Sequence, residues 1–156
     1  MADGPTDRRT TVRIEQVVDN LPAGFETLRE EARVEQYRML DRLATEWDAG
    51  AIRFNRPGEA LFVAYVSGIL AGIGGITVDP DIPGALRMRR FYVRAPFRRD
   101  GVGRKIAQAL LASVPGLVPL ITVNAAAGSE PFWEALGLSP QAGASHTHVL
   151  GLKPTG

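Results

Sequence analysis

A short basic segment with two glycines is the part of the sequence best suited to bind an anion. It spans residues 98–103, reads Arg-Arg-Asp-Gly-Val-Gly, and comes directly before a stretch with helical spacing of apolar residues. The first turn of a helix has backbone N–H groups without intrahelical partners and about half a positive charge, which attracts anions. Gly101 and Gly103 let a diphosphate approach the main chain, and arginines on either side add charge-assisted hydrogen bonds. We therefore predict a diphosphate site over residues 98–104.

Basic residues are concentrated around this segment. The chain has a net charge of +1, but residues 87–105 hold eight Arg and Lys residues against the single acid Asp100, which gives that stretch a charge of +7 and leaves −6 for the rest. A local positive patch on an acidic molecule favours a compact anion as the partner. A long nucleic-acid track needs a broader basic face, and an RNA contact would show a steep salt dependence.

Several kinds of site are excluded or disfavoured by the residues present. The chain has no cysteine, so disulfides, thiolate metal ligands and an acyl-cysteine intermediate are excluded. The Gly-Lys-Ser/Thr and Gly-x-Gly-x-x-Gly nucleotide motifs are absent, and we interpret the glycines of residues 72–75 as strand packing. His146 and His148 share one face of a predicted strand, but two imidazoles without a third ligand do not make a metal site, and we predict none.

The elements that must position these residues follow a mixed pattern of strands and helices. Alternating or continuous apolar runs predict strands over 11–17, 60–66, 69–78, 85–93, 117–123 and 146–152. Helical spacing predicts one broken helix or two short ones over 24–49, where the apolar stripe slips near Tyr37, and further helices over 102–114 and 129–136. We predict an α/β protein with an α+β mixed sheet in the order β-α-α-β-β-β-α-β-α-β.

This order suits one domain over residues 11–153, preceded by a polar leader over residues 1–10. The N-terminus has no apolar signal region and no apolar run is long enough to cross a bilayer, so we expect a cytoplasmic protein without a membrane partner. A homodimer is compatible with the sequence.

The sequence resembles a known family, the GNAT superfamily of acyl-CoA-dependent N-acyltransferases, over nearly its whole length. The family signature, Arg/Gln-x-x-Gly-x-Gly/Ala after a central strand, is matched within residues 89–104. A second hallmark, an aromatic pair followed by Glu-x-x-Gly, is matched by residues 132–137. The resemblance implies a GNAT-like fold that binds acetyl-CoA. The cofactor-binding residues that it implies are Phe91, Tyr92, Val93, Arg98, Arg99, Asp100, Gly101, Val102, Gly103, Arg104, Asn124, Ser129, Phe132 and Trp133.

The reaction implied by the resemblance is transfer of an acetyl group to the primary amine of a small molecule or peptide. The absence of cysteine favours direct attack in a ternary complex over an acyl-enzyme. Backbone N–H groups near Phe91 to Val93 are suited to polarise the thioester carbonyl. The tyrosine that the family often uses as general acid is replaced by Trp133, and a frequent glutamate of the central strand by Arg87. A non-catalytic acyl-CoA-binding module is therefore the alternative.

Residue type leaves several candidates for proton transfer and for acceptor binding. Tyr92 and Tyr65 are the candidate proton donors. The candidate bases are Asp79, His148, His146, Glu30, Glu31 and Glu35. The arginines that could pair with a carboxylate on the acceptor are Arg53, Arg56, Arg87 and Arg89.

Overall fold

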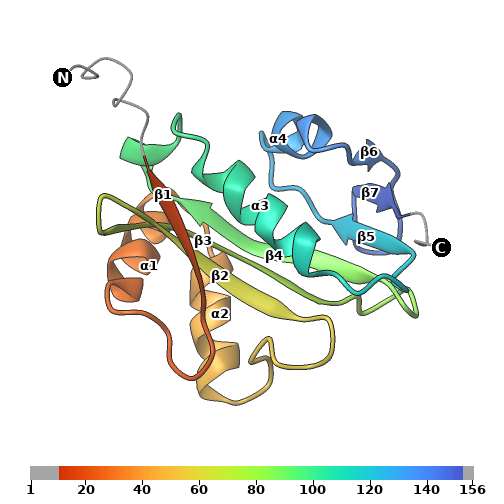
Figure 1. Cartoon of the computed structure of the whole chain (residues 1–156), viewed down its shortest axis with the longest axis horizontal. Helices are drawn as coiled ribbons and strands as arrows, with labels where there is room; N and C mark the ends of the chain where they lie inside the picture. The colour runs from red at the N-terminus through yellow and green to blue at the C-terminus, as the bar shows by residue number, and fades with distance from the viewer. Residues whose placement is uncertain (1–10, 153–156) are drawn as a thin grey trace.

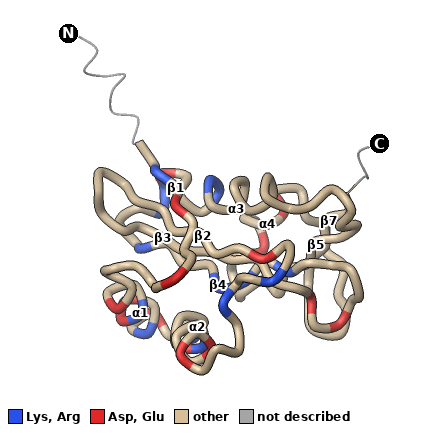
Figure 2. Tube along the Cα trace, turned by 60° about the horizontal axis from the view of Figure 1, so that its bottom comes forward, with Lys and Arg blue, Asp and Glu red and all other residues tan. Residues whose placement is uncertain are grey.

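The computed structural model describes residues 11–152, and it places a seven-stranded sheet between two helical layers (Figures 1 and 2). The strands lie in the order β1-β2-β3-β4-β5-β7-β6. They are β1 Val12–Gln16, β2 Ala60–Val66, β3 Ile69–Val78, β4 Leu86–Val93, β5 Leu120–Val123, β6 Ser139–Pro140 and β7 His148–Gly151. The helices are α1 Phe25–Val34, α2 Met39–Asp48, α3 Val102–Ser113 and α4 Glu130–Ala135, with a 3-10 helix, η2, at Ala95–Phe97.

Each helix packs through the apolar stripe that its sequence repeats. α1 and α2 bury Phe25, Leu28, Leu43 and Trp47 in one core on their face of the sheet. On the opposite face, α3 buries Val102, Ile106 and Leu110 in a second core, which also contains Trp133 of α4. The sheet between the two cores is apolar on both sides, which explains the eight consecutive buried residues of β3.

The mixed α/β architecture predicted from the sequence is confirmed. The apolar stripe that slips near Tyr37 corresponds to two helices, α1 and α2, joined by a short link. The C-terminal region differs from the prediction, because β7 begins only at His148 and the two-residue strand β6 pairs with it. Gly143 N–H donates to the His146 carbonyl at 3.0 Å, so the chain is still turning at residue 146. The predicted leader over residues 1–10 lies outside the described residues.

The sheet opens between β4 and β5. These strands are parallel and pair only through Leu86–Met88 and Ile121–Val123, whereas β4 continues to Val93 beside β3. The β3–β4 register shifts between Ile73 and Gly75, and Arg90 at this irregularity has a φ of 64°. The bulge turns the end of β4 away from β5, so the carboxyl ends of the two strands diverge.

Glycines in β3 make room for this bulge. A Cβ on Gly74 would lie 2.8 Å from Cε2 of Phe91 and 2.9 Å from Cγ2 of Ile106. A Cβ on Gly72 would lie 3.2 Å from the Tyr92 carbonyl oxygen. The interpretation of residues 72–75 as strand packing is confirmed, because they lie within β3 and bring α3 and the bulge against it.

Candidate active site

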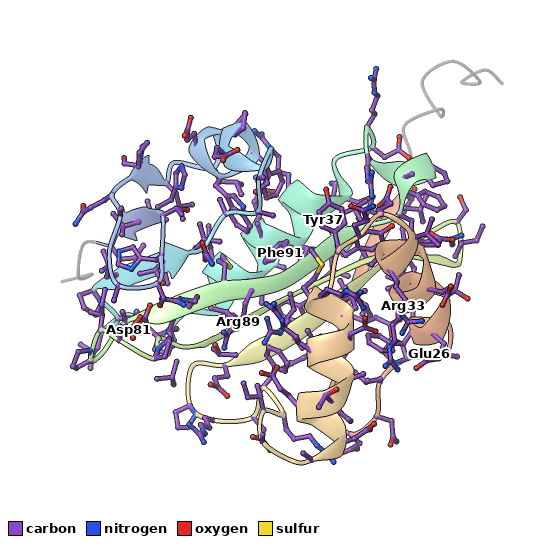
Figure 3. All side chains as sticks on the ribbon, turned by 180° about the vertical axis from the view of Figure 1, so that it is seen from behind. Glu26, Arg33, Tyr37, Asp81, Arg89 and Phe91 are labelled. Carbon is purple, nitrogen blue, oxygen red and sulfur yellow. The ribbon has the colours of Figure 1, made fainter. Side chains whose placement is uncertain are left out.

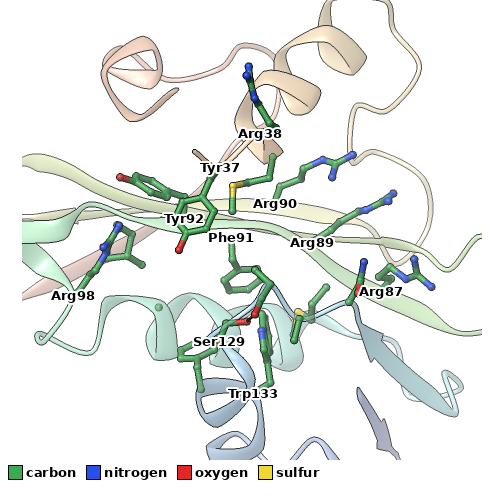
Figure 4. Close-up of a pocket in the computed structure, with 18 of the residues that line it drawn as sticks. Tyr37, Arg38, Arg87, Arg89, Arg90, Phe91, Tyr92, Arg98, Ser129 and Trp133 are labelled. Carbon is green, nitrogen blue, oxygen red and sulfur yellow. Dashed lines mark hydrogen bonds between the residues drawn. The ribbon is translucent and has the colours of Figure 1, made fainter. Parts of the chain in front are cut away.

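A cavity of about 760 Å³ extends from the first turn of α3, past the gap between β4 and β5, to the start of α2 (Figure 4). Tyr37, Phe91 and Arg89 follow one another along it, beside β4 (Figure 3). Its lining residues are Gln36, Tyr37, Arg38, Met39, Arg42, Arg87, Met88, Arg89, Arg90, Phe91, Tyr92, Val93, Arg98, Gly101, Gly103, Arg104, Asn124, Ala125, Ala126, Ser129, Phe132 and Trp133. One continuous space therefore joins the basic glycine segment to the helices of the other face.

The first turn of α3 forms one end of this cavity. Gly101 is the N-cap residue, and Lys105 N–H makes the first hydrogen bond, to the Gly101 carbonyl at 3.0 Å. The backbone N–H groups of residues 101–104 donate to no acceptor within residues 11–152. Four free donors and the positive end of the helix dipole make this turn chemically suited to an anion.

The two glycines of this turn serve different purposes. Gly101 has a φ of 76°, and a Cβ there would meet no atom within 4 Å, so the residue is required by its backbone conformation and faces open space. At Gly103 a Cβ would lie 3.2 Å from Cε1 of Phe132 and 3.5 Å from Cγ2 of Val93. Gly103 therefore lets the helix begin close to β4 and α4.

The end of β4 offers backbone groups to the cavity. Arg94 N–H donates to the Ala71 carbonyl of β3 at 2.8 Å. Backbone groups alternate in direction along a strand, so Val93 N–H and C=O point to the opposite side, where β5 no longer pairs. The Val93 carbonyl accepts a hydrogen bond of 2.8 Å from Nε of Arg98. Val93 N–H is left facing the gap, where an extended amide-containing ligand could pair with it.

Three aromatic rings form the wall below the bulge. The Phe91 and Trp133 ring centroids are 4.9 Å apart at an interplanar angle of 81°, and those of Phe132 and Trp133 are 4.8 Å apart at 84°. These edge-to-face contacts fix α4 against β4. Trp133 is buried, and its indole N–H cannot act as an acid at neutral pH.

On the other side of β4, Tyr92 belongs to a polar cluster with Glu35 and Arg98. The Tyr92 hydroxyl donates to Oε1 of Glu35 at 2.8 Å, and Arg98 also donates to this oxygen. Burial, followed by the nearby Glu35 carboxylate, raises the pKa of Tyr92. The phenol therefore keeps its proton at neutral pH. The hydrogen bond from Arg98 lowers the pKa of Glu35, which is therefore ionised.

Comparison with known proteins identifies the family. A model of the acetyltransferase (GNAT) domain matches residues 24–146, which is most of the chain. The chain belongs to the GNAT acetyltransferase family. No curated protein matches it.

Solved structures share the GNAT fold of this chain. A protein from Exiguobacterium sp. 255-15 superimposes with a TM-score of 0.82 at 22% identity, over 90% of this chain and 93% of that one. A GNAT family acetyltransferase from Brucella melitensis, solved in complex with acetyl-CoA, superimposes with a TM-score of 0.63 at 15% identity, over 92% of this chain and 90% of that one. A GCN5-related N-acetyltransferase from Kribbella flavida superimposes with a TM-score of 0.63 at 18% identity, over 92% of this chain and 98% of that one. At these identities the likeness is one of fold.

Most of the cofactor residues that the GNAT resemblance implied line the cavity. The exceptions are Arg99, Asp100 and Val102. Arg99 and Asp100 are exposed on the loop, whereas the Val102 side chain is fully buried in the core. Val102 can therefore contribute its backbone N–H alone.

Of the three residues predicted to be catalytic, only Tyr92 lines the main cavity. Asp79 is buried, with Thr122 donating to it at 2.6 Å and Arg87 3.3 Å away. Burial raises the pKa of Asp79, but the hydrogen bond from Thr122, two from backbone N–H groups and the Arg87 charge together hold it below its usual value. His148 is also buried, with Nε2 2.9 Å from Oε2 of Glu134. The geometry gives both residues structural contacts and does not place them as bases.

The other candidate bases also lie away from the cavity. Glu31 accepts two hydrogen bonds of 2.9 Å from Arg94. Glu30 pairs with Arg33 on the exposed side of α1. His146 is buried against Gly143. None of these side chains lines the main cavity. Tyr65, the second candidate acid, lies under Arg13 of β1.

The sequence analysis missed the residues that the link between α1 and α2 brings to the cavity. They are Gln36, Tyr37, Arg38, Met39 and Arg42. Four of these five side chains are exposed, so their types alone indicate a solvated helix surface. The slip of the apolar stripe near Tyr37 was the one available signal, because it marks where the chain turns.

Two kinds of site are absent from residues 11–152. No group of three or more His, Cys, Asp or Glu residues there could hold a metal ion. No helix in that range is long and apolar enough to cross a membrane.

Proposed function

We propose that this GNAT protein transfers an acetyl group from acetyl-CoA to a primary amine by direct attack in a ternary complex. The observation that carries the proposal is the single cavity that joins an anion site on α3, the open edge of β4 and a polar chamber beside α2. Donor and acceptor can enter it from opposite ends and meet at the bulge. The Brucella melitensis relative solved with acetyl-CoA and the Kribbella flavida N-acetyltransferase support this choice.

The residues present fit acetyl-CoA as the donor. The free N–H groups of residues 101–104 and the exposed guanidinium of Arg104 would hold the diphosphate. Val93 N–H would pair with the pantetheine chain, and the gap beside Phe91 would receive the thioester. Asn124 and Ser129 would line the far side. The wall formed by Phe91, Phe132 and Trp133 would exclude water from the reacting carbon.

The nucleophile must be a neutral amine, because an ammonium has no free electron pair. No Asp, Glu or His lines the main cavity within the described residues, whereas seven arginines do. Like charges disfavour the ammonium form, so the arginines lower the pKa of a bound amine and promote proton loss to solvent. The amine nitrogen then bonds to the acetyl carbon, and the carbon–sulfur bond breaks to release the CoA thiolate. The nitrogen loses its extra proton to solvent, which leaves the neutral amide.

Tyr92 is the proposed proton donor to that thiolate. It lines the cavity, and its raised pKa keeps the phenol protonated at neutral pH. Its hydroxyl proton, which points to Glu35, must turn toward the sulfur in order to be donated, and the tyrosinate then takes a proton back from solvent. Proximity supplies much of the remaining rate, since aligning two bound reactants is worth several kcal/mol.

The test combines donor binding with product release. Acetyl-CoA at about 100 times its Kd is expected to stabilise the protein by about 2.7 kcal/mol, measured as a thermal shift. Gly101→Glu places a carboxylate in the anion site and is expected to abolish the shift. Gly68→Glu is the matched control, since Gly68 has a similar φ of 81°, has no atom within 4 Å of a Cβ and lies outside the cavity.

Turnover is then followed as free thiol released with a panel of amines. The chain has no cysteine, so every thiol detected belongs to CoA. Binding without thiol release for any amine would favour the alternative, a non-catalytic acyl-CoA-binding module. No thermal shift of the wild type at saturating acetyl-CoA would contradict the proposal altogether.

A further inference from the structure

We infer that the acceptor carries an acidic group, a carboxylate or a phosphate, in addition to its amine, and that Arg89 binds this group with Arg38 and Arg42 beside it. This inference rests on the proposed function and names the class of acceptor. It concerns the end of the cavity next to α2, away from the donor site.

The first observation is the charge of the cavity wall. The lining contains seven arginines, namely Arg38, Arg42, Arg87, Arg89, Arg90, Arg98 and Arg104. No acidic side chain from the described part of the chain lines it. Such a wall repels polyamines and other purely cationic acceptors and attracts anionic ones.

The second observation is that three of these arginines already have strong acidic partners. Arg87 lies 3.3 Å from Asp79, and Arg90 donates to both carboxylate oxygens of Glu46 at 2.8 and 3.0 Å. Arg98 is bound to Glu35. Arg104 is not paired with an acid within residues 11–152, but it stands at the donor end on α3.

The acceptor end therefore holds the remaining three. Arg38 has one acidic contact, 3.5 Å from Asp41, and its side chain is 69% exposed. Arg42 and Arg89 have no acidic partner among the residues that the structure describes. These side chains are the ones able to bind an anionic ligand.

Arg89 is the strongest of the three. It lies on β4 at the bulge, and it extends in the same direction as Arg90 (Figure 4). Its Nε atom is buried and has no hydrogen-bond partner. Burial, followed by the charge of Arg90, lowers the pKa of Arg89. An anion at this guanidinium would satisfy a buried donor and compensate a charge that the protein leaves uncompensated.

The helix opposite supplies the second cation. Met39, Arg42 and Glu46 are spaced at i, i+3 and i+7 and share one face of α2. Glu46 on this face reaches β4 through Arg90, so Arg42, one turn earlier, also faces β4 at the cavity. The thioether of Met39 gives the same chamber an apolar wall.

This assignment changes the set of acceptor arginines that residue type had indicated. Arg53 and Arg56 line only a second cavity of about 320 Å³, whose wall Arg89 shares with the main one, and Arg53 Nε donates to the Trp47 carbonyl at 2.8 Å. Arg87 is neutralised by Asp79. Only Arg89 of the original four both lines the main cavity and is free of an acidic partner within residues 11–152.

The test compares matched acceptors by kcat/KM, measured as thiol release. β-Alanine is paired with its amide, and phosphoethanolamine with ethanolamine, so the two arms separate carboxylate from phosphate. We expect the anionic member of at least one pair to be preferred at least tenfold. Arg89→Gln is expected to bring that ratio close to one, whereas Arg13→Gln, the same charge change on β1 outside the cavity, is expected to leave it intact.

A folding readout keeps the test decisive. Arg89→Gln removes an uncompensated buried charge, so the Tm of the free protein is expected to stay level or rise. A preference for neutral or cationic amines in both pairs, or an Arg89→Gln variant that keeps the wild-type ratio, would overturn the inference. Neither result would affect the acetyl-CoA thermal shift, so failure here is distinct from failure of the proposed function.

Discussion

The hydroxyl of Tyr92 lies 2.8 Å from Oε1 of Glu35, although 57 residues separate the two in sequence. The same carboxylate binds Arg98, whose Nε atom donates to the Val93 carbonyl at 2.8 Å. Glu35 follows the last turn of α1, so one carboxylate joins the helices of the acceptor end, the central strand and the loop before α3. Changes at Glu35 are therefore expected to be felt at both ends of the cavity.

The first prediction concerns acid stability. The hydrogen bond from Arg98 holds the pKa of Glu35 below its ordinary value, so its contribution to stability is present above the unfolded pKa and is lost as the pH falls through the folded one. The Tm of the wild type should therefore decrease as the pH is lowered below about 5. Asp41 and Asp79 also have lowered pKa values, so the Glu35→Gln variant should lose stability with acid as well, but less steeply. Parallel Tm curves for the two proteins from pH 3 to 7 would contradict this account.

The second prediction separates two arginines of the donor site. Arg98→Ala removes the hydrogen bond to Val93 and the ion pair with Glu35, so we expect a loss of about 1–2 kcal/mol in the unfolding free energy of the free protein. Arg104 is exposed and makes no ion pair within residues 11–152, so Arg104→Ala should change that free energy by less than about 0.5 kcal/mol. Both variants should weaken acetyl-CoA binding, measured by titration calorimetry.

Two results would contradict these roles of Arg98 and Arg104. If Arg98→Ala weakens acetyl-CoA without lowering the stability of the free protein, Arg98 acts as a direct ligand rather than as a support for the loop. If Arg104→Ala leaves the Kd of acetyl-CoA unchanged, the diphosphate lies elsewhere on the turn.

The third prediction concerns the packing beneath the bulge. Gly74→Ala would place a methyl group 2.8 Å from Cε2 of Phe91 and 2.9 Å from Cγ2 of Ile106. Overpacking of this kind costs about 1–3 kcal/mol, and the displaced Phe91 ring should also slow thiol release. Gly151→Ala is the control, because a Cβ on that strand residue would meet no atom within 4 Å. Equal stability of both variants by denaturant unfolding would show that the bulge adapts freely.

The parts of the fold and site that the sequence predicted are those set by local chemistry. The apolar residues of α3 repeat with the period of a helix, and the continuous apolar run of β3 is typical of a buried strand. Both elements could therefore be predicted from their own residues. The start of α3 at Val102, directly after Gly101, was also predictable, whereas diphosphate binding by residues 98–104 stays a prediction.

The remainder depends on contacts between residues far apart in the chain. The ion pair of Arg90 with Glu46 spans 44 residues, and the bond between Thr122 and Asp79 spans 43. These partners decide which charges are neutralised, and residue type contains no such information. Asp79 and His148 were therefore candidates by type, whereas Arg42, an ordinary residue of a helix surface, was not.

The last prediction concerns the pH dependence of the reaction. Among residues 11–152, no carboxylate or imidazole lines the main cavity, so no protein group there is placed to take the proton of the amine. The neutral fraction of an amine increases tenfold per pH unit below its pKa, so kcat/KM should rise with pH and level off at the pKa of the free acceptor amine. Two acceptors whose amine pKa values differ by about 2 units should give profiles displaced by a similar amount. A single inflection near pH 6.5 for both acceptors would instead indicate a protein imidazole, and His146 and His148 would return as candidate bases.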